Sequence, residues 1–296
     1  MSEDTGGIIP NLPSLLRIKQ WSKNFFLFGA LVFAKRLFDP HMVLATIQGF
    51  FAFSLAASTI YIINDIRDRE EDRLHPEKCH RPIPAGKIST GQALIIAFFC
   101  LAGGLALSYF LAWEFQLLLL TYIAMQIVYT FGGKRIVILD TLTIALGFVL
   151  RVVAGAAIIH VPVSSWLLLC TFFLALFLAF CKRRHELATL DEATRHRKVL
   201  GDYTLPFLDQ MITMATAATI LCYALYVTSP STQVKFHSPY LIATIPFVVY
   251  GIARYLYLLH NRDMGGNPTD VLMGDGPFAI NVLLWIAASI LIVYTG

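Results

Sequence analysis

Charged side chains are scarce in this chain. Aspartate, glutamate, lysine and arginine make up 14% of its 296 residues, whereas 57% are hydrophobic. A soluble domain carries about 25% charged residues, so the scarcity excludes an ordinary soluble protein, and we expect no nucleic-acid partner. Apolar runs of the roughly 20 residues that a helix needs to cross a bilayer recur along the whole sequence. These features predict an all-α polytopic membrane protein.

The sequence also lacks metal-ligand cysteine pairs, and we expect no cleavable leader. The five cysteines show no paired spacing typical of a metal site, so we interpret them as packing residues or inert thiols. Residues 1–13 are acidic and polar rather than basic and then apolar, unlike a cleavable signal peptide. The first span is therefore expected to serve as the insertion signal.

Glycine, proline and short polar clusters divide the apolar sequence into nine predicted spans. None of the joints has the length or composition of a linker, so we expect one domain over residues 1–296, in which residues 1–23 form a cytoplasmic or interfacial segment. Lys35 and Arg36 interrupt the first span. The predicted spans are 24–38, 41–63, 90–110, 113–131, 139–160, 164–181, 206–229, 239–260 and 277–295.

Lysine and arginine are unevenly distributed between the predicted loops. With the N-terminus inside, most of them fall on one side of the membrane. Because these residues are enriched in cytoplasmic loops, the loops after spans two, four, six and eight are expected to face the cytoplasm. The loops after spans two and six are both charged and lie four spans apart, which favours an internal duplication with one functional loop in each half.

A dense acidic cluster ends the second span. On a helix, Asp65, Asp68 and Asp72 would stand at i, i+3 and i+7 and share one face. Together with Asn64 they suit Mg²⁺, which takes oxygen ligands and is commonly held by one or two carboxylates plus substrate phosphates. A face of this kind at a membrane surface favours diphosphate chemistry. The alternative is a solvated helix whose arginines only pair with neighbouring acids.

Lys182 and Arg183 begin the second charged loop. Cations outnumber acids there, which favours an anion receptor over a metal cage. Glu186 lies four residues after Lys182 on the same helical face, where it would either complete a metal site or pair with that lysine. Asp191 and Glu192 are expected to lie on a solvated face.

Five further residues carry weaker signals. Arg81 lies in a stiff, proline-rich cationic turn that could close over an anion. Lys23 and Asn24 are either interfacial anchors or functional residues. Lys134 is either a topology determinant or a contact for pyrophosphate. Arg254 lies in a span, so it should face a structural partner or a ligand inside the bundle.

Taken together, these motifs resemble a known family. Asn64-Asp65-x-x-Asp68-x-x-x-Asp72 after the second span, Arg81-Pro82-Ile83 and the charged loop after the sixth resemble the UbiA superfamily of intramembrane prenyltransferases over nearly the whole chain. Within it, a narrower set of motifs is similar to the phosphoribosyltransferases that act on decaprenyl phosphate. That set is Arg17-x-x-Gln20-Trp21-x-Lys23-Asn24, Asn64-Asp65-Ile66-Arg67-Asp68, His75-Pro76-x-Lys78, Arg81-Pro82-Ile83, Lys182-Arg183-x-x-Glu186-Leu187, Tyr203-Thr204 and Arg254-Tyr255.

The resemblance implies a UbiA-like bundle with cytoplasmic active-site loops in a bacterial inner membrane. It implies transfer of 5-phosphoribose from phosphoribosyl pyrophosphate (PRPP) to a polyprenyl phosphate, with release of pyrophosphate. This would be the first step toward a lipid-linked arabinose for cell-wall polysaccharide. The implied cofactor is Mg²⁺, or Mn²⁺ in its place. Lipid length and assembly into a homo-oligomer are left open.

The resemblance also implies roles for individual residues. The implied catalytic residues are Asp65, Asp68 and Asp72. The implied metal ligands are Asn64, Asp65, Asp68, Asp72 and Glu186. The implied substrate-binding residues are Lys23, Asn24, Asn64, Arg81, Lys134, Lys182, Arg183, Glu186, Tyr203 and Arg254. Many relatives with aromatic acceptors have a second aspartate-rich motif where this chain has Lys182-Arg183-x-x-Glu186, and an arginine there suits a sugar phosphate.

Two other functions remain to be weighed. A prenyl-diphosphate transferase acting on an aromatic quinone or haem precursor would use the same acidic face, but its second loop should favour two carboxylates. A transporter or lipid-binding protein would place charges and broken helices near the bilayer midplane. Most of the charge here lies instead at one predicted surface.

Overall fold

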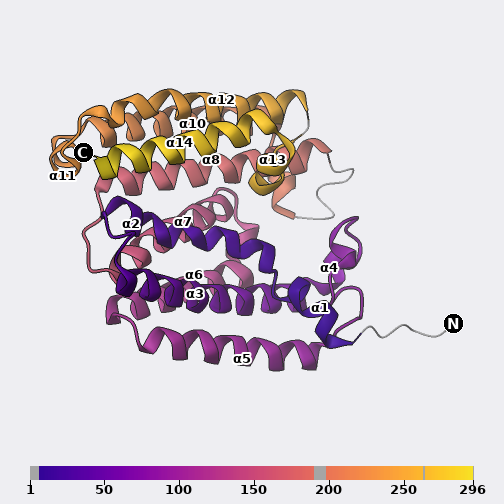
Figure 1. Cartoon of the computed structure of the whole chain (residues 1–296). Helices are drawn as coiled ribbons and strands as arrows, with labels where there is room; N and C mark the ends of the chain where they lie inside the picture. Colours follow the sequence, from indigo (N-terminus) through magenta and orange to yellow (C-terminus); the bar gives the residue numbers. More distant parts are fainter. Residues whose placement is uncertain (1–6, 190–197, 263, 296) are drawn as a thin grey trace. The chain divides into compact units, whose positions relative to one another are not determined.

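The computed structural model describes residues 7–189, 198–262 and 264–295. Over these residues the chain forms helices and no strands (Figure 1), which confirms the predicted all-α class. Eight helices in this described part are long and apolar enough to cross a membrane. They are α3 (Pro40–Arg67), α5 (Thr90–Tyr109), α6 (Trp113–Phe131), α7 (Leu139–Ile158), α8 (Ser165–Thr189), α10 (Leu205–Thr228), α12 (Ile245–Asn261) with the preceding η5 (Tyr240–Thr244), and α14 (Gly276–Thr295).

Shorter helices occupy the ends and connections. They are α1 (Ile8–Leu15), η1 (Ile18–Phe26), α2 (Leu27–Phe33), α4 (Arg69–Arg73), η2 (Lys78–His80), η3 (Gly133–Arg135), η4 (Lys198–Asp202), α11 (Pro230–Phe236) and α13 (Pro268–Gly274). The acidic cluster extends from the last turn of α3 into α4, and the cationic turn that follows it lies around η2.

The first predicted span is not one long helix. Residues 24–38 are divided between the 3₁₀ helix η1 and the seven-residue α2, and Lys35 then takes a positive φ of 58°. Seven α-helical residues rise only about 10 Å, well short of the roughly 30 Å apolar core of a bilayer. The count of nine spans is therefore not confirmed, whereas each of the other eight predicted spans coincides with a long helix.

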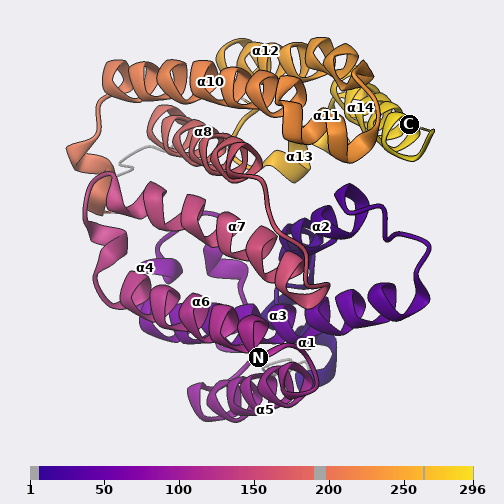
Figure 2. The same cartoon turned by 90° about the vertical axis from the view of Figure 1, so that its left-hand side faces the viewer.

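Contacts divide the chain into two compact units. The first comprises Met1–Lys134 and Leu150–Val161, and the second comprises Arg135–Val149 and Pro162–Gly296, so that α7 contributes a part to each. Within the first unit α3 packs most extensively against α5, and within the second α8 packs most extensively against α10 (Figures 1 and 2). Each pair is joined by one of the two charged loops, which supports the predicted correspondence between these loops.

Local sequence signals fix the starts of α3 and α5. Asp39 accepts hydrogen bonds from two of the backbone N–H groups that follow it, and Pro40 takes the first helical position of α3. Ser89 and Gln92 form a reciprocal capping box at the start of α5. Both helices of the main pair in the first unit therefore begin at defined residues.

A close approach in the first unit positions η1 and α2 against α7. A Cβ on Gly155 of α7 would collide with the backbone carbonyl of Leu27, which is fully buried. Only glycine allows this contact. The contact places Lys23 and Asn24, at the end of η1, beside Arg151 of α7.

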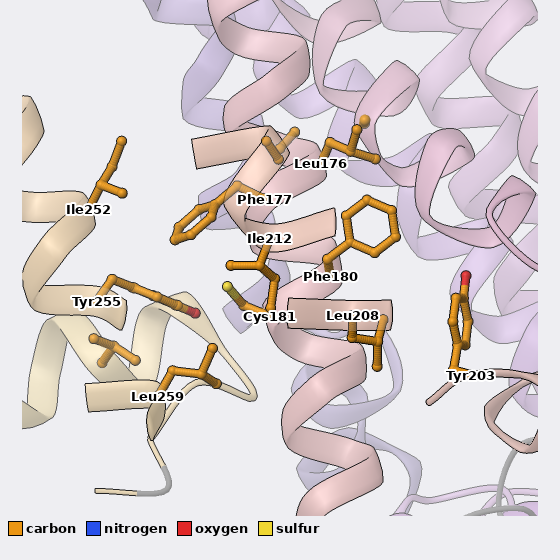
Figure 3. Close-up of a cluster of buried hydrophobic side chains, with 14 of the residues drawn as sticks. Leu176, Phe177, Phe180, Cys181, Tyr203, Leu208, Ile212, Ile252, Tyr255 and Leu259 are labelled. Atoms are coloured by element: carbon orange, nitrogen blue, oxygen red, sulfur yellow. The ribbon is translucent and has the colours of Figure 1, made fainter. Parts of the chain in front are cut away.

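Aromatic and branched side chains of α8, α10 and α12 form the core of the second unit (Figure 3). Phe177 of α8 lies edge-on to Tyr255 of α12, with ring centroids 5.5 Å apart. Ile212 of α10 and Cys181 of α8 are buried in the same cluster. All five cysteines are free thiols and four are buried, as expected of packing residues.

Candidate active site

The acidic cluster lies where α3 ends. The helix stops at Arg67, Asp68 has φ −92° and ψ 10°, and α4 (Arg69–Arg73) starts after it. Asp65 is 2% exposed and Asp72 is 4% exposed, so these two carboxylates are buried in the first unit. A buried carboxylate needs a positive or hydrogen-bonding partner, and both have several.

One arginine joins Asp65 to Asp72. Nη1 of Arg81 donates to Oδ1 of Asp65 at 3.0 Å and to Oδ2 of Asp72 at 2.7 Å. Asp65 also accepts from Arg17, and Nζ of Lys78 lies 3.8 Å from Oδ1 of Asp72. Arg81 therefore lies between two carboxylates, in the position that a bridging cation would take. The motif reasoning singled out neither Arg17 nor Lys78 as a site residue.

Asp68 faces a different cation. Both of its carboxylate oxygens accept from Nζ of Lys134, which also donates to Oδ1 of Asn64 at 3.1 Å. Asp65 and Asp72 thus share a partner and Asp68 does not, because the helix is interrupted at Asp68 itself. Among the residues that the structure describes, no three histidine, cysteine or acidic side chains converge closely enough to hold a metal ion in this conformation.

The donor types nevertheless fit a divalent cation. Burial raises the pKa of Asp72 above its ordinary value, Arg81 and Lys78 act against that rise, and Asp65 and Asp68 add to it. Asp65 and Asp68 are therefore close enough to destabilise the charged form of Asp72. A cation among them relieves this repulsion, and in this structure cationic side chains do so.

A rigid turn presents Arg81. Ile83 is buried under the turn, and Nε of Arg73 donates to the carbonyl oxygen of Pro84 at 3.2 Å. Gly86 has φ +75°, a left-handed conformation that suits glycine. The cationic turn expected from the sequence is therefore present, and it directs Arg81 at the acidic cluster.

A second group of polar side chains lies in the first unit, next to an earlier part of α3 than the acidic cluster. Nε of Arg151 donates to Oδ1 of Asn24 at 2.7 Å, and its Nη2 donates to the hydroxyl oxygen of Tyr122 at 3.0 Å. Nδ2 of Asn24 in turn donates to Oγ of Ser54 at 2.8 Å. Asn24 is 1% exposed, so it holds Arg151 in place. Lys23 lies next to this group.

In the second unit, Arg183 lies at the centre of a buried network. Its Nε donates to Oδ2 of Asp140 at 2.7 Å, and its Nη1 donates to Oε2 of Glu186 at 2.7 Å. The hydroxyl of Tyr203 donates to Oδ1 of Asp140 at 2.7 Å and accepts from the backbone N–H of Ile138 at 2.7 Å. Burial raises the pKa of Tyr203 to about 12, and the bond to Asp140 adds to the rise. The phenol therefore keeps its proton and donates.

This network revises the roles expected in the second loop. Arg183 is 1% exposed and Asp140 is 0% exposed, so Arg183 orients its neighbours from inside the protein, whereas Lys182 is exposed. Sequence reasoning missed Asp140, although its signal is visible as an acidic residue within a predicted span. Asp191 and Glu192 lie outside the described residues.

Arg254 is held by a two-point ion pair. Its Nε lies 3.1 Å from Oδ1 of Asp275, and its Nη2 lies 2.7 Å from Oδ2. Asp275 also accepts from the backbone N–H of Phe278 at 2.8 Å, at the start of α14. Of the two roles left open for Arg254, the structure favours the structural partner.

Comparison with known proteins gives matches along most of the chain. Residues 24–269 match the UbiA prenyltransferase family. The chain is 33% identical over 291 residues to the decaprenyl-phosphate phosphoribosyltransferase of Mycolicibacterium smegmatis, covering 94% of this chain and 91% of that protein. It is 35% identical over 287 residues to the protein of the same name from Corynebacterium glutamicum, covering 94% and 85%.

The fold is similar to that of a UbiA homolog from Archaeoglobus fulgidus solved with GPP and Mg²⁺. The TM-score is 0.72 at 22% sequence identity, and the match covers 95% of this chain and 99% of that one. At this identity the likeness concerns the fold alone. The family match spans most of the chain and the two enzymes exceed 30% identity over most of their length. The chain therefore belongs to the UbiA prenyltransferase family.

Proposed function

We propose that this protein transfers the 5-phosphoribosyl group of PRPP to a polyprenyl phosphate at the cytoplasmic face of a bacterial inner membrane. The bond between the anomeric carbon and the pyrophosphate oxygen breaks, and an oxygen of the lipid phosphate bonds to that carbon. The observation that carries the proposal is the identity of 33% and 35%, over most of the chain, to two enzymes named decaprenyl-phosphate phosphoribosyltransferase.

The acidic cluster suits the leaving group of this reaction. Asp65, Asp68 and Asp72, with Asn64, would hold Mg²⁺, which when bound neutralises charge on the departing pyrophosphate. The presence of Mg²⁺ in the solved Archaeoglobus homolog supports this assignment. Glu186, the fifth metal ligand that the resemblance implied, we assign instead to Arg183, with which it is paired.

The cations around the cluster suit the phosphates of the donor. Arg81, Lys78 and Lys134 each bind an acidic side chain here, and each can turn to a phosphate oxygen once the acids are engaged elsewhere. The lipid phosphate is already an anion and attacks without a strong general base. The protein therefore has to hold two anionic substrates in line and shield their mutual repulsion.

The network of the second unit suits positioning rather than direct binding. Arg183, Asp140 and Tyr203 satisfy one another inside the protein. Lys182 lies next to Arg183 in α8 and is exposed. We assign it to a substrate phosphate. The network fixes the part of α8 in which Lys182 lies.

The competing function is transfer of a prenyl group from a prenyl diphosphate to an aromatic acceptor. It is favoured by the solved homologs bound to GPP and DMAPP, whose folds match at TM-scores of 0.72 and 0.71. In that reaction the lipid is the electrophile, whereas in the proposed reaction it is the nucleophile. Supplying each lipid substrate therefore separates the two.

The test uses the purified full chain in detergent or nanodiscs. PRPP labelled in its ribose is supplied with Mg²⁺ and a polyprenyl phosphate, and label is measured in the organic phase. We expect lipid-linked label that depends on all three components. Label that stays in the aqueous phase, while a prenyl diphosphate is consumed with an aromatic acceptor, would overturn the proposal. Asp68→Asn serves as the inactive control.

A further inference from the structure

The charged groups that act on Lys23 are cations and include no acid. Among the described residues Lys23 has no hydrogen-bond or ion-pair partner, and its charged neighbours are Arg17 and Arg151. It is partly buried at the end of η1. Burial, together with the charges of Arg151 and Arg17, lowers the pKa of Lys23 to about 8. An ammonium group in this setting is stabilised by a bound anion.

The two neighbouring arginines have their own partners. Arg17 donates to Asp65 and lies over the ring of Tyr61 at 4.9 Å. Arg151 donates to Asn24 and Tyr122. Both arginines are therefore held by their own partners, and Lys23 is the neighbouring cation that a ligand can bind.

The position of Lys23 relative to the acidic cluster is informative. Arg17 is a neighbour of both Lys23 and Asp65, and so links Lys23 to the acidic cluster. On the other side, Asn24 bonds to Ser54 of α3, eleven positions before Asp65 and about 16 Å away along the helix axis. The cations thus extend from the acidic cluster toward the part of the unit that lies within the predicted membrane.

An apolar surface formed by η1, α2 and α3 includes residues on either side of Lys23 in the sequence. Five aromatic rings contact one another in pairs, with centroids 5.2 to 6.5 Å apart. Two of them are well exposed, Phe25 at 62% and Phe51 at 45%. The five rings are Trp21, Phe25, Phe28, Phe50 and Phe51. An isoprenoid chain is apolar along its whole length, so such a surface is complementary to it.

We propose that Lys23, flanked by Arg17 and Arg151, binds the phosphate group of the polyprenyl phosphate acceptor, with the first isoprene units against the aromatic surface of Trp21, Phe25 and Phe51. This inference rests on the proposed function. It separates the two anions of the reaction, because the pyrophosphate of the donor is assigned to the acidic cluster and its cations, and the lipid phosphate to the next cation inward.

The competing occupant of Lys23 is the 5-phosphate of PRPP. A donor that dissolves in water has no need of an exposed aromatic surface, whereas a lipid phosphate matches both the charge of Lys23 and the rings beside it. Asn24 and Arg151 are buried, and Asn24 bonds to α3 well before the acidic cluster, in a predicted span. This position favours a ligand that arrives from the bilayer. The experiment below treats the 5-phosphate as the outcome that overturns the assignment.

The first experiment measures binding without PRPP. The full chain in nanodiscs is titrated with a polyprenyl phosphate and, separately, with the polyprenol of the same length. We expect the wild type to bind the phosphate more tightly, and Lys23→Met to lose about tenfold or more of that affinity, as charge-assisted hydrogen bonds imply. Binding of the alcohol should not change. Lys23→Arg should keep the preference for the phosphate.

The matched control is Lys19→Met. Lys19 lies on the same 3₁₀ helix and is exposed, so its loss should leave lipid affinity unchanged. Lys23→Met removes an unpaired, partly buried charge, so we expect it to fold at least as stably as the wild type by thermal unfolding. If it unfolds, Lys23→Gln is tested in its place in the same assay.

Kinetics separate this inference from the proposed function. Lys23→Met should raise KM for the lipid phosphate about tenfold and leave KM for PRPP unchanged. A rise in KM for PRPP alone would assign Lys23 to the donor and overturn the inference, with the transfer reaction intact. Wild-type protein that binds lipid phosphate through Lys23 but transfers no ribose would instead contradict the proposed function alone.

Discussion

Asp140 and Arg183 form an ion pair closed to solvent, with Oδ2 and Nε 2.7 Å apart and side chains 0% and 1% exposed. The second oxygen of Asp140 accepts from Tyr203, and Nη1 of Arg183 donates to Glu186. Taking both charges out of water is costly, and hydrogen bonds of this kind are what offset the cost. The pair therefore depends on each of its members, and it anchors the part of α8 that carries Lys182.

The first prediction concerns this pair. Asp140→Ala leaves Arg183 buried with one of its two acids missing, so we expect it to lower the free energy of unfolding by about 3 kcal/mol. Chemical denaturation in detergent micelles measures the change. The double variant Asp140→Ala, Arg183→Met removes both charges and should lose less than Asp140→Ala alone. An Asp140→Ala protein as stable as the wild type would contradict this interpretation of the network.

The second prediction concerns the cation between Asp65 and Asp72. Arg81→Gln removes the positive charge that their carboxylates share, so the acidic cluster should bind a divalent cation more tightly when no donor is present. We expect Mn²⁺ affinity to rise by about threefold to tenfold, in the direction that Coulomb attraction requires. Turnover should fall, because the same arginine is assigned to the pyrophosphate.

Metal binding and turnover of this variant are measured separately. Mn²⁺ affinity is followed by electron paramagnetic resonance of the free ion. Arg36→Gln is the matched control, since Arg36 is largely exposed and pairs only weakly with Asp39 at 3.8 Å. Equal Mn²⁺ affinity in the Arg81→Gln variant and the wild type would show that Arg81 does not compete with a metal at this position.

Much of the fold follows from hydrophobic length alone. Eight apolar runs form the eight long helices, because a helix that crosses a bilayer must satisfy its backbone internally over about 20 residues. The first apolar run does not form a long helix. Lys35 and Arg36 limit it, and its residues form a 3₁₀ helix and a seven-residue helix instead. Apolar composition alone does not distinguish a run that forms one long helix from a run that forms two short ones.

The sequence predicts which residues form the acidic cluster, but not how their side chains are arranged. Spacing along an uninterrupted helix places Asp65, Asp68 and Asp72 on one face, but α3 ends between the first and second of them. Which cation each acid binds depends on contacts that are distant in the chain, as with Lys134 and Asp68. Sequence spacing carries no information about such contacts, and Asp140 was missed for the same reason.

The third prediction concerns Asp68. Its side chain lies near the surface, 16% exposed, and is paired with Lys134, so Asp68→Asn should leave folding close to that of the wild type. Because the residue is assigned to the metal, turnover should fall by about 100-fold or more. The assay is ribose transfer to lipid, run beside thermal unfolding of the same preparation. A variant that loses activity only because it unfolds would indicate a structural role for Asp68.

The fourth prediction concerns the pH dependence of lipid capture by Lys23. Because the pKa of Lys23 is lowered to about 8, the group is charged below that pH and loses its proton as pH rises through it. The phosphate-binding form is therefore the low-pH form. The charged groups that face Lys23 are Arg17 and Arg151, and Tyr61 and Tyr122 lie beside those arginines.

The ratio kcat/KM for the lipid phosphate reports groups of the free enzyme, so it should fall by up to about tenfold for each pH unit above 8. The same ratio for PRPP, at saturating lipid, should not show this fall, since a bound phosphate raises the pKa of the lysine beside it. Lys23→Arg keeps a positive charge throughout the range and should flatten the profile. A fall that persists in Lys23→Arg would assign the titration to another group, because the arginine at this position cannot lose its proton between pH 7 and about 10.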